Sequence, residues 1–185
     1  MKVLVAYASR HGATSGIAER LTTVLSAEGV TAECHPIRDV RIMERGGHLD
    51  RYDAFVIGSA VYAFHWLDEA RNFIHRNDQV LRSRPVYLFG SGPLGDKATD
   101  EKGHEFLTPP SDMIDLAERV NARETRMFFG AWDPTAKPIG VMEHFLRLVP
   151  ADRSPLQEGD FRNWDQIDAW ARSIAHELAA AAVPA

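Results

Sequence analysis

A short apolar run, a polar loop and an amphipathic stretch follow one another at the start of the chain. Residues 3–6, with the sequence VLVA, have the composition of a strand buried on both faces of a parallel sheet. After the loop, apolar residues recur with the spacing of one helix face, at Ile17, Leu21, Val24 and Leu25. This order predicts a strand–loop–helix unit, the building block of parallel α/β sheets.

The loop between strand and helix has the composition of a phosphate-binding turn. Its sequence is SRHGATSG, residues 9–16, and it contains neither a dinucleotide-binding G-x-G-x-x-G motif nor a Walker A motif. The first N–H groups of a helix lack intrahelical partners and the helix dipole is positive there, so an anion is favoured. Gly12 permits close backbone approach, and the hydroxyls of Ser9, Thr14 and Ser15 can add hydrogen bonds. The alternative, in which Ser9 or Thr14 only caps the helix, stays open.

The rest of the chain repeats the alternation of strands and helices. We expect strands at residues 30–37, 54–58, 85–89 and 125–131, and helices at 68–77, from Ser111, at 138–148 and after Asn163. Residues 38–51 are polar and are expected to form a loop with at most one helical turn. The pattern predicts a single α/β domain over residues 1–185, a three-layer sandwich around a five-stranded parallel sheet. The strand order expected for such a sheet is 2-1-3-4-5.

Two helix starts carry specific signals. Ser111 is expected to cap a helix that turns Ile114, Ala117 and Val120 inward. Asn163 and Gln166 have the spacing of a capping box at the start of the last helix.

Composition limits the partners and the compartment. The formal charge of -5 over 185 residues, with no basic stripe, argues against a nucleic-acid partner. No apolar run is long enough to span a membrane. Cys34 is the only cysteine and is expected to be a buried, inert thiol in a strand. Because no intrachain disulfide can form and the chain opens directly in a strand, we expect a cytoplasmic location.

Three loops of small and aromatic residues are expected to meet at one edge of the sheet. They follow strands 1, 3 and 4 and comprise residues 9–16, 59–66 and 90–96. In the order 2-1-3-4-5, ligands bind at the carboxyl ends of strands 1 and 3. The first loop suits a phosphate, the second offers the flat side chains Tyr62, Phe64 and Trp66, and the third exposes backbone groups. A phosphate, a planar ring and a hydrogen-bonding rim together describe FMN.

These residues resemble those of a known family, the flavodoxin-like FMN proteins. Within that family the chain is most similar to the menaquinone-dependent, oxygen-independent protoporphyrinogen oxidases and their actinobacterial flavodoxin-domain relatives. The resemblance covers nearly the whole chain and rests on S-R-x-G-x-T at residues 9–14, Tyr52-Asp53, V-I-G at 56–58, the loop 59–66, F-G-A at 129–131 and F-R-N-W at 161–164. It implies a flavodoxin-like fold.

The resemblance also implies which residues hold FMN. The phosphate would be held by Ser9, Arg10, Gly12, Ala13, Thr14 and Ser15. His11 stands where the family has a hydroxyl or acidic residue, and its imidazole can pair with the phosphate or point to solvent. The isoalloxazine would be flanked by Ser59, Ala60, Val61, Tyr62 and Phe64, and by Ser91, Gly92, Pro93, Leu94 and Gly95. The pattern assigns neither a catalytic residue nor a metal site, although His65 is the best candidate for proton handling.

Three functions remain open. The resemblance implies an FMN-dependent oxidoreductase acting on protoporphyrinogen with a quinone acceptor. Residues 95–112, however, contain five acidic residues and only two lysines, Lys97 and Lys102. This charge balance disfavours a dianionic porphyrinogen or an anionic membrane surface. The alternatives are an electron-carrier flavodoxin with a redox protein partner and a flavin-free interaction module of the same fold. Peripheral membrane contact and a homodimer also stay open.

Overall fold

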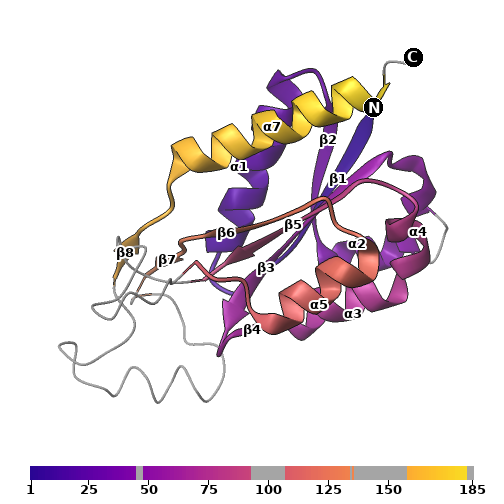
Figure 1. The fold of residues 1–185 in the computed structure, drawn as a ribbon. Coiled ribbons are helices and arrows are strands. Elements are labelled where there is room, and N and C mark those ends of the chain that lie inside the picture. Colours follow the sequence, from indigo (N-terminus) through magenta and orange to yellow (C-terminus); the bar gives the residue numbers. More distant parts are fainter. Residues whose placement is uncertain (45–47, 93–106, 134, 136–157, 183–185) are drawn as a thin grey trace.

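Five parallel strands form the sheet of this protein in a computed structural model. The structure describes residues 1–44, 48–92, 107–133, 135 and 158–182, and for residues 41–44 it describes the backbone alone. The spatial order of the strands is β2-β1-β3-β5-β6 (Figure 1). The bounds are Lys2–Ala8 for β1, Thr31–Pro36 for β2, Ala54–Tyr62 for β3, Val86–Ser91 for β5 and Glu124–Phe128 for β6. Counting the parallel strands alone, this is the predicted order 2-1-3-4-5, which is confirmed.

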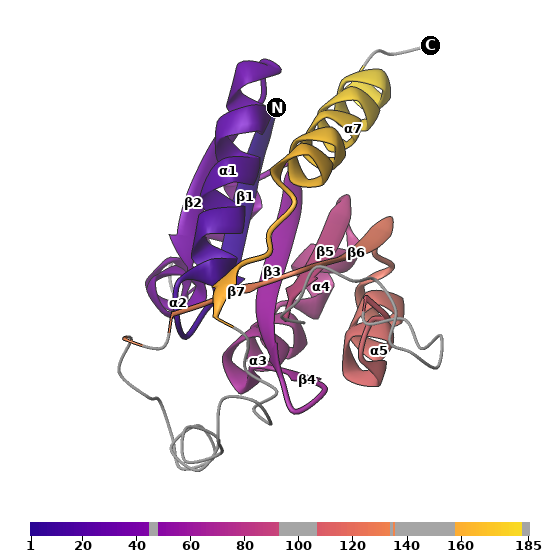
Figure 2. The ribbon, with the colours of Figure 1, turned by 90° about the vertical axis from the view of Figure 1, so that its left-hand side faces the viewer.

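Helices cover both faces of the sheet and complete the three layers. Figures 1 and 2 show α1 (Ala13–Ala27) and α7 (Trp164–Ala182) together on one face. The opposite face carries α2 (Ile37–Glu44), α3 (Asp68–Arg76), α4 (Asp78–Arg82) and α5 (Ser111–Val120). None of the described helices is both long enough and apolar enough to cross a bilayer.

Each face of the sheet has its own core because side chains alternate along a strand. In β1, Val3 and Val5 join the cluster that contains Ile17 of α1 and Ile174 of α7. Leu4, between them, belongs to the cluster under α3 and α5. The apolar run that marked this strand in the sequence therefore supplies both cores, as expected for a central parallel strand.

The prediction of a loop over residues 38–51 was wrong. Helix α2 occupies Ile37–Glu44, and a 3₁₀ helix, η1, occupies His48–Arg51. Ile37 and Val40, one turn apart, are fully buried against the sheet. Since most helical stability in proteins comes from packing of one apolar face, these two side chains outweigh the polar character of the segment.

Helix starts were predicted with mixed success. The N-cap position of α5 is Pro110, so Ser111 is its first helical residue and does not cap it. Ile114 is 44% exposed, whereas Met113, Leu116 and Val120 are buried. Val120 and the partly buried Ala117 therefore face the core as predicted, whereas Met113 and Leu116 take the core positions expected of Ile114. At α7 the prediction holds in its first half, because the side-chain oxygen of Asn163 accepts the N–H of Gln166 at 3.0 Å.

The last parallel strand is shorter than predicted. It ends at Phe128, and Ala131 opens a separate strand, β7 (Ala131–Trp132), which pairs antiparallel with β8 (Gly159–Asp160).

Cys34 is only partly buried, and burial raises the pKa of its thiol. The expected helix at 138–148 and the expected site residues Pro93, Leu94 and Gly95 lie outside the described residues.

Candidate functional site

A hollow lies at the carboxyl edge of the sheet, where four strands end. The loop after β1 and the first turn of α1 contribute Ser9, Arg10, His11, Ala13 and Thr14. The ends of β3 and β5 contribute Ala60, Val61, Tyr62, Ser91 and Gly92, and the segment after β6 contributes Gly130, Ala131 and Trp132. Chain winding reverses between β1 and β3, which is where doubly wound sheets bind their ligands.

One end of the hollow is the start of helix α1. Gly12 takes the left-handed conformation, with φ of 88°, in the N-cap position. The first helical hydrogen bond runs from the N–H of Gly16 to the carbonyl of Gly12 at 3.0 Å. The N–H groups of Ala13, Thr14 and Ser15 therefore have no acceptor one turn earlier in the helix. Together with the helix dipole, they form a site suited to a phosphate.

Two serines brace this turn. Ser9 Oγ accepts the N–H of Gly12 at 3.1 Å, and Ser15 Oγ donates to the carbonyl of Gly12 at 2.8 Å. Gly12 and Ser15 do not line the hollow but border a neighbouring depression that also contains Ser9 and Arg38. Of the hydroxyls singled out from the sequence, Ser9 and Thr14 face the hollow, and Thr14 is 1% exposed.

The aromatic wall comes from a β-hairpin. Strand β3 continues past the predicted end at Gly58 to Tyr62 and pairs antiparallel with β4 (His65–Trp66). Tyr62 lines the hollow, and the guanidinium of Arg10 lies over its ring at 4.8 Å from the centroid. This cation–π contact joins the first and second loops.

The other aromatic residues of this loop take different roles. Phe64 is 86% exposed at the tip of the turn and is not among the residues around the hollow. Trp66 was expected to offer a stacking surface, but it is 2% exposed in the core beneath α3 and α5, because it anchors the hairpin base. The Ser59 side chain is likewise buried and structural, since its Oγ accepts the N–H of Leu67 at 3.0 Å.

His65 lies beside the hairpin base and not on the wall of the hollow. Its Nδ1 is 3.5 Å from Oδ2 of Asp112, and the same carboxylate oxygen accepts the N–H of Trp66 at 3.0 Å. Asp112 therefore ties the hairpin to the start of α5, and His65 is held next to it with 60% of its side chain exposed.

The third wall is backbone-rich. Ser91 is buried at the end of β5, and the N–H of Gly92 donates to the carbonyl of Phe128 at 3.3 Å. A Cβ added at Gly92 would lie 2.8 Å from Cβ of Val61. A glycine is therefore required here, where the ends of the neighbouring strands β3 and β5 lie against each other at the wall of the hollow.

Gly130, Ala131 and Trp132 were not predicted as site residues. They follow β6, and parallel strands present their carboxyl ends at one edge, so the rule applied to strands 1, 3 and 4 also reaches strand 5. The segment has the same sequence pattern as residues 59–62, small residues followed by an aromatic ring. That similarity was the available signal.

The comparisons with known proteins agree with this architecture. A family model described as a flavodoxin domain matches residues 4–134. The chain therefore belongs to the flavodoxin domain family. Protoporphyrinogen IX dehydrogenase (quinone) of Escherichia coli strain K12 is 21% identical to it over 182 residues, which cover 95% of this chain and 96% of that protein.

Solved structures show the same fold at low sequence identity. Oxidised flavodoxin 2 from Bacillus cereus superposes with a TM-score of 0.59 at 18% identity, covering 96% of this chain and 99% of the other. Rubredoxin oxygen:oxidoreductase from the anaerobe Desulfovibrio gigas gives a TM-score of 0.61 at 15% identity. That match covers 97% of this chain but only 36% of the larger protein.

Family membership identifies the cofactor as FMN and the chain as a flavodoxin-like oxidoreductase. The described residues fit such a cofactor. The three N-terminal N–H groups of α1 suit its phosphate, and the Tyr62 wall and the Gly92 backbone suit a flat heterocycle.

Proposed function

We propose that the hollow binds FMN with the phosphate at the start of α1 and the isoalloxazine toward the Tyr62 hairpin. The observation that carries this proposal is the opening of one hollow onto both the α1 N-terminus and an aromatic side chain.

Specific residues would take specific parts. The N–H groups of Ala13 and Thr14, which both line the hollow, would bind the phosphate oxygens, with the Thr14 hydroxyl beside them and the N–H of Ser15 at the border with the neighbouring depression. Ala60, Val61, Tyr62 and Trp132 would pack against the ring, and Ser91 and Gly92 would offer backbone groups to its polar edge. Arg10, which lies over Tyr62, would partly neutralise the phosphate or cover the ring wall.

The cofactor supplies the redox chemistry when it is bound, since a flavin accepts and releases one or two electrons. The chain's residues supply binding, orientation and exclusion of water. Val61, Tyr62 and Trp132 make the ring end of the hollow apolar, which favours a neutral heterocycle over water. The fixed N–H groups at the other end hold the phosphate without a rearrangement.

For the acceptor, we propose a quinone. The support is the match to the E. coli dehydrogenase over nearly the full length of both chains, at 21% identity. The acidic balance of residues 95–112 works against a dianionic porphyrinogen as the electron donor.

The test begins with the visible absorbance spectrum of the purified protein, before and after addition of FMN. Flavin bands and quenched flavin fluorescence are expected on binding. Turnover of a quinone with a reduced donor, protoporphyrinogen among them, then separates an enzyme from an electron carrier, which would exchange electrons with a reductase but not turn over a quinone. A protein that ignores FMN at high micromolar concentration contradicts the proposal.

A further inference from the structure

We infer that Arg162 is a positioning residue for the phosphate end of the hollow, acting through the first peptide of α1. The inference rests on the proposed position of the FMN phosphate. Arg162 follows β8, far along the chain from the loop that it reaches. Its Nη1 donates to the carbonyl of Ala13 at 3.4 Å, across a separation of 149 residues.

The guanidinium is held rigidly from two sides. Asp160 accepts its Nε at 2.7 Å and its Nη2 at 2.6 Å, a two-pronged pair of the kind that orients arginine strongly. The indole of Trp164 lies 4.4 Å from the guanidinium carbon, ring centroid to Cζ. Hydrogen bonding by Arg162 lowers the pKa of Asp160, so this carboxylate stays ionised. With 16% of its side chain exposed, Arg162 is therefore fixed where it meets α1.

Gly16 makes the approach possible. A Cβ added at this position would overlap Nη1 of Arg162. Glycine inside a helix is less favourable than alanine, so a glycine in the first turn of α1 calls for a packing reason. The close approach of the Arg162 guanidinium supplies that reason.

The chemistry of the contact points toward the phosphate. The carbonyl of Ala13 and the N–H of Thr14 belong to the same peptide group. A cation that donates to the carbonyl polarises that peptide and makes its N–H a stronger donor. The N–H of Thr14 is one of the N–H groups at the α1 N-terminus with no acceptor one turn earlier in the helix, and Thr14 lines the hollow at the proposed phosphate end. Arg162 thus acts on the phosphate through the backbone and without touching it.

A purely structural role would be different. Arg162 also ties the β7–β8 pair to α1, and a tether alone would affect all ligands of the hollow alike. Riboflavin has the same ring as FMN but no phosphate group. Comparing the affinities for FMN and riboflavin therefore distinguishes the two roles.

The experiment measures dissociation constants of FMN and riboflavin by quenching of flavin fluorescence. For Arg162→Gln we expect FMN affinity to fall about five- to tenfold and riboflavin affinity to stay within about twofold. Gly16→Ala, which displaces the guanidinium, should show the same selective loss, and it carries the test if Arg162→Gln does not fold. Arg123→Gln is the control, since Arg123 pairs with Glu177 on α7 and its own N–H bonds to Val86 at the start of β5.

The outcomes are distinct. Selective loss of FMN binding in both variants, with the control unchanged, supports the positioning role. Equal loss of FMN and riboflavin binding, or no loss, overturns it and leaves a structural tether. Failure of the unaltered protein to bind FMN, by contrast, overturns the proposed function itself.

Discussion

Arg20 of α1 and Asp168 of α7 form a two-pronged ion pair that joins the two helices on one face of the sheet. Nε of Arg20 lies 2.7 Å from Oδ1 and Nη2 lies 2.6 Å from Oδ2. Asp168 is 7% exposed, although it is charged. Hydrogen bonding by Arg20 lowers the pKa of Asp168 and outweighs the opposing effect of burial. The guanidinium of Arg20 therefore neutralises the charge of a carboxylate that is buried in the α1–α7 interface.

Replacing Asp168 by asparagine is expected to lower the free energy of unfolding by about 1–3 kcal/mol at pH 7. The folded-state pKa of Asp168 lies below its ordinary value of 3.8. The stabilisation is therefore fully present above pH 3.8 and is lost as the pH falls through the lower, folded-state pKa. Urea unfolding at pH 7 and pH 2.5 checks this, with the exposed Asp115→Asn as control. An equal effect of Asp168→Asn at both pH values would contradict the expectation.

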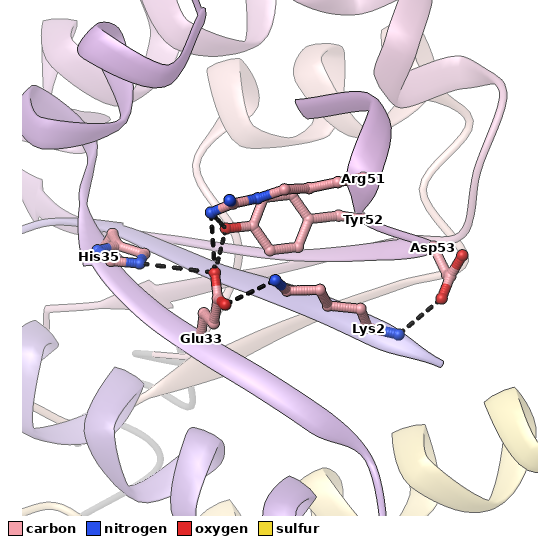
Figure 3. A network of polar contacts seen from close by, with 6 residues as sticks. All are labelled: Lys2, Glu33, His35, Arg51, Tyr52 and Asp53. Carbon is pink, nitrogen blue, oxygen red and sulfur yellow. Dashed lines mark hydrogen bonds and ion pairs between the residues drawn. The ribbon is translucent and has the colours of Figure 1, made fainter. Parts of the chain in front are cut away.

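Glu33 of the edge strand β2 lies at the centre of a second network of charged and polar side chains (Figure 3). Its carboxylate lies 2.7 Å from Nζ of Lys2 and accepts the hydroxyl of Tyr52 at 2.5 Å. These two hydrogen bonds, from Lys2 first and from Tyr52 second, lower the pKa of Glu33. Burial and the carboxylate of Glu33 raise the pKa of Tyr52.

Tyr52→Phe is expected to destabilise the protein by about 1–2 kcal/mol at pH 7. Because the pKa of Glu33 is lowered on folding, its contribution is present above its ordinary pKa and is lost as the pH falls through the folded value. The penalty of Tyr52→Phe should therefore shrink by pH 3. A double-mutant cycle with Glu33→Gln, followed by urea unfolding, measures the coupling, and additive effects would show that the two groups do not interact.

Gly58 in the centre of β3 is packed directly under Phe89. A Cβ at this position would overlap the ring of Phe89, which itself packs against Phe128 and Trp170. We expect Gly58→Ala to cost about 1–3 kcal/mol through overpacking. Adding Phe89→Leu should recover part of that loss, because the smaller side chain gives the methyl group room. Thermal unfolding of the two single variants and the double variant tests this, and a double variant as unstable as the sum of both changes would contradict it.

Tyr62 and Phe64 form a matched pair for the proposed flavin site. Tyr62→Ala is expected to weaken FMN binding about three- to tenfold, because an aromatic wall of the hollow is removed. Phe64→Ala should change the affinity less than about twofold, since Phe64 is exposed at the hairpin tip and is not among the residues around the hollow. Fluorescence titration with FMN compares them. The reverse ranking would mean that the ring lies over the tip of the hairpin.

Much of the fold follows from local patterns. The order of the parallel strands was predicted from the alternation of strands and helices through the rule for doubly wound sheets. The β1–loop–α1 unit and the cap at Asn163 were predicted because each depends on residues close together in the chain. Helix α2 was missed for the opposite reason. Its few apolar residues specify a helix only when the sheet is present to bury Ile37 and Val40.

The candidate site divides in the same way. Loops after strands 1, 3 and 4 could be placed at one edge from topology alone, and residues from each of them line the hollow. The hairpin decides that Trp66 is buried, that Ser59 accepts a backbone hydrogen bond and that Phe64 is exposed. Its first strand, β3, runs four residues beyond the predicted strand end. No short window of sequence shows which aromatic ring faces a ligand and which enters the core.

By itself, the sequence determined the alternation of strands and helices and the loop that suits a phosphate, because hydrophobic period and turn composition act over a few residues. The sheet order followed from that alternation through the rule for doubly wound sheets. Only the tertiary structure decided that Trp132 joins the hollow, that Arg20 meets Asp168 and that Arg162 reaches Ala13. Each of these contacts joins segments far apart in the chain. Their partners are selected by the packing of helices and strand ends around the finished sheet, which no local pattern encodes.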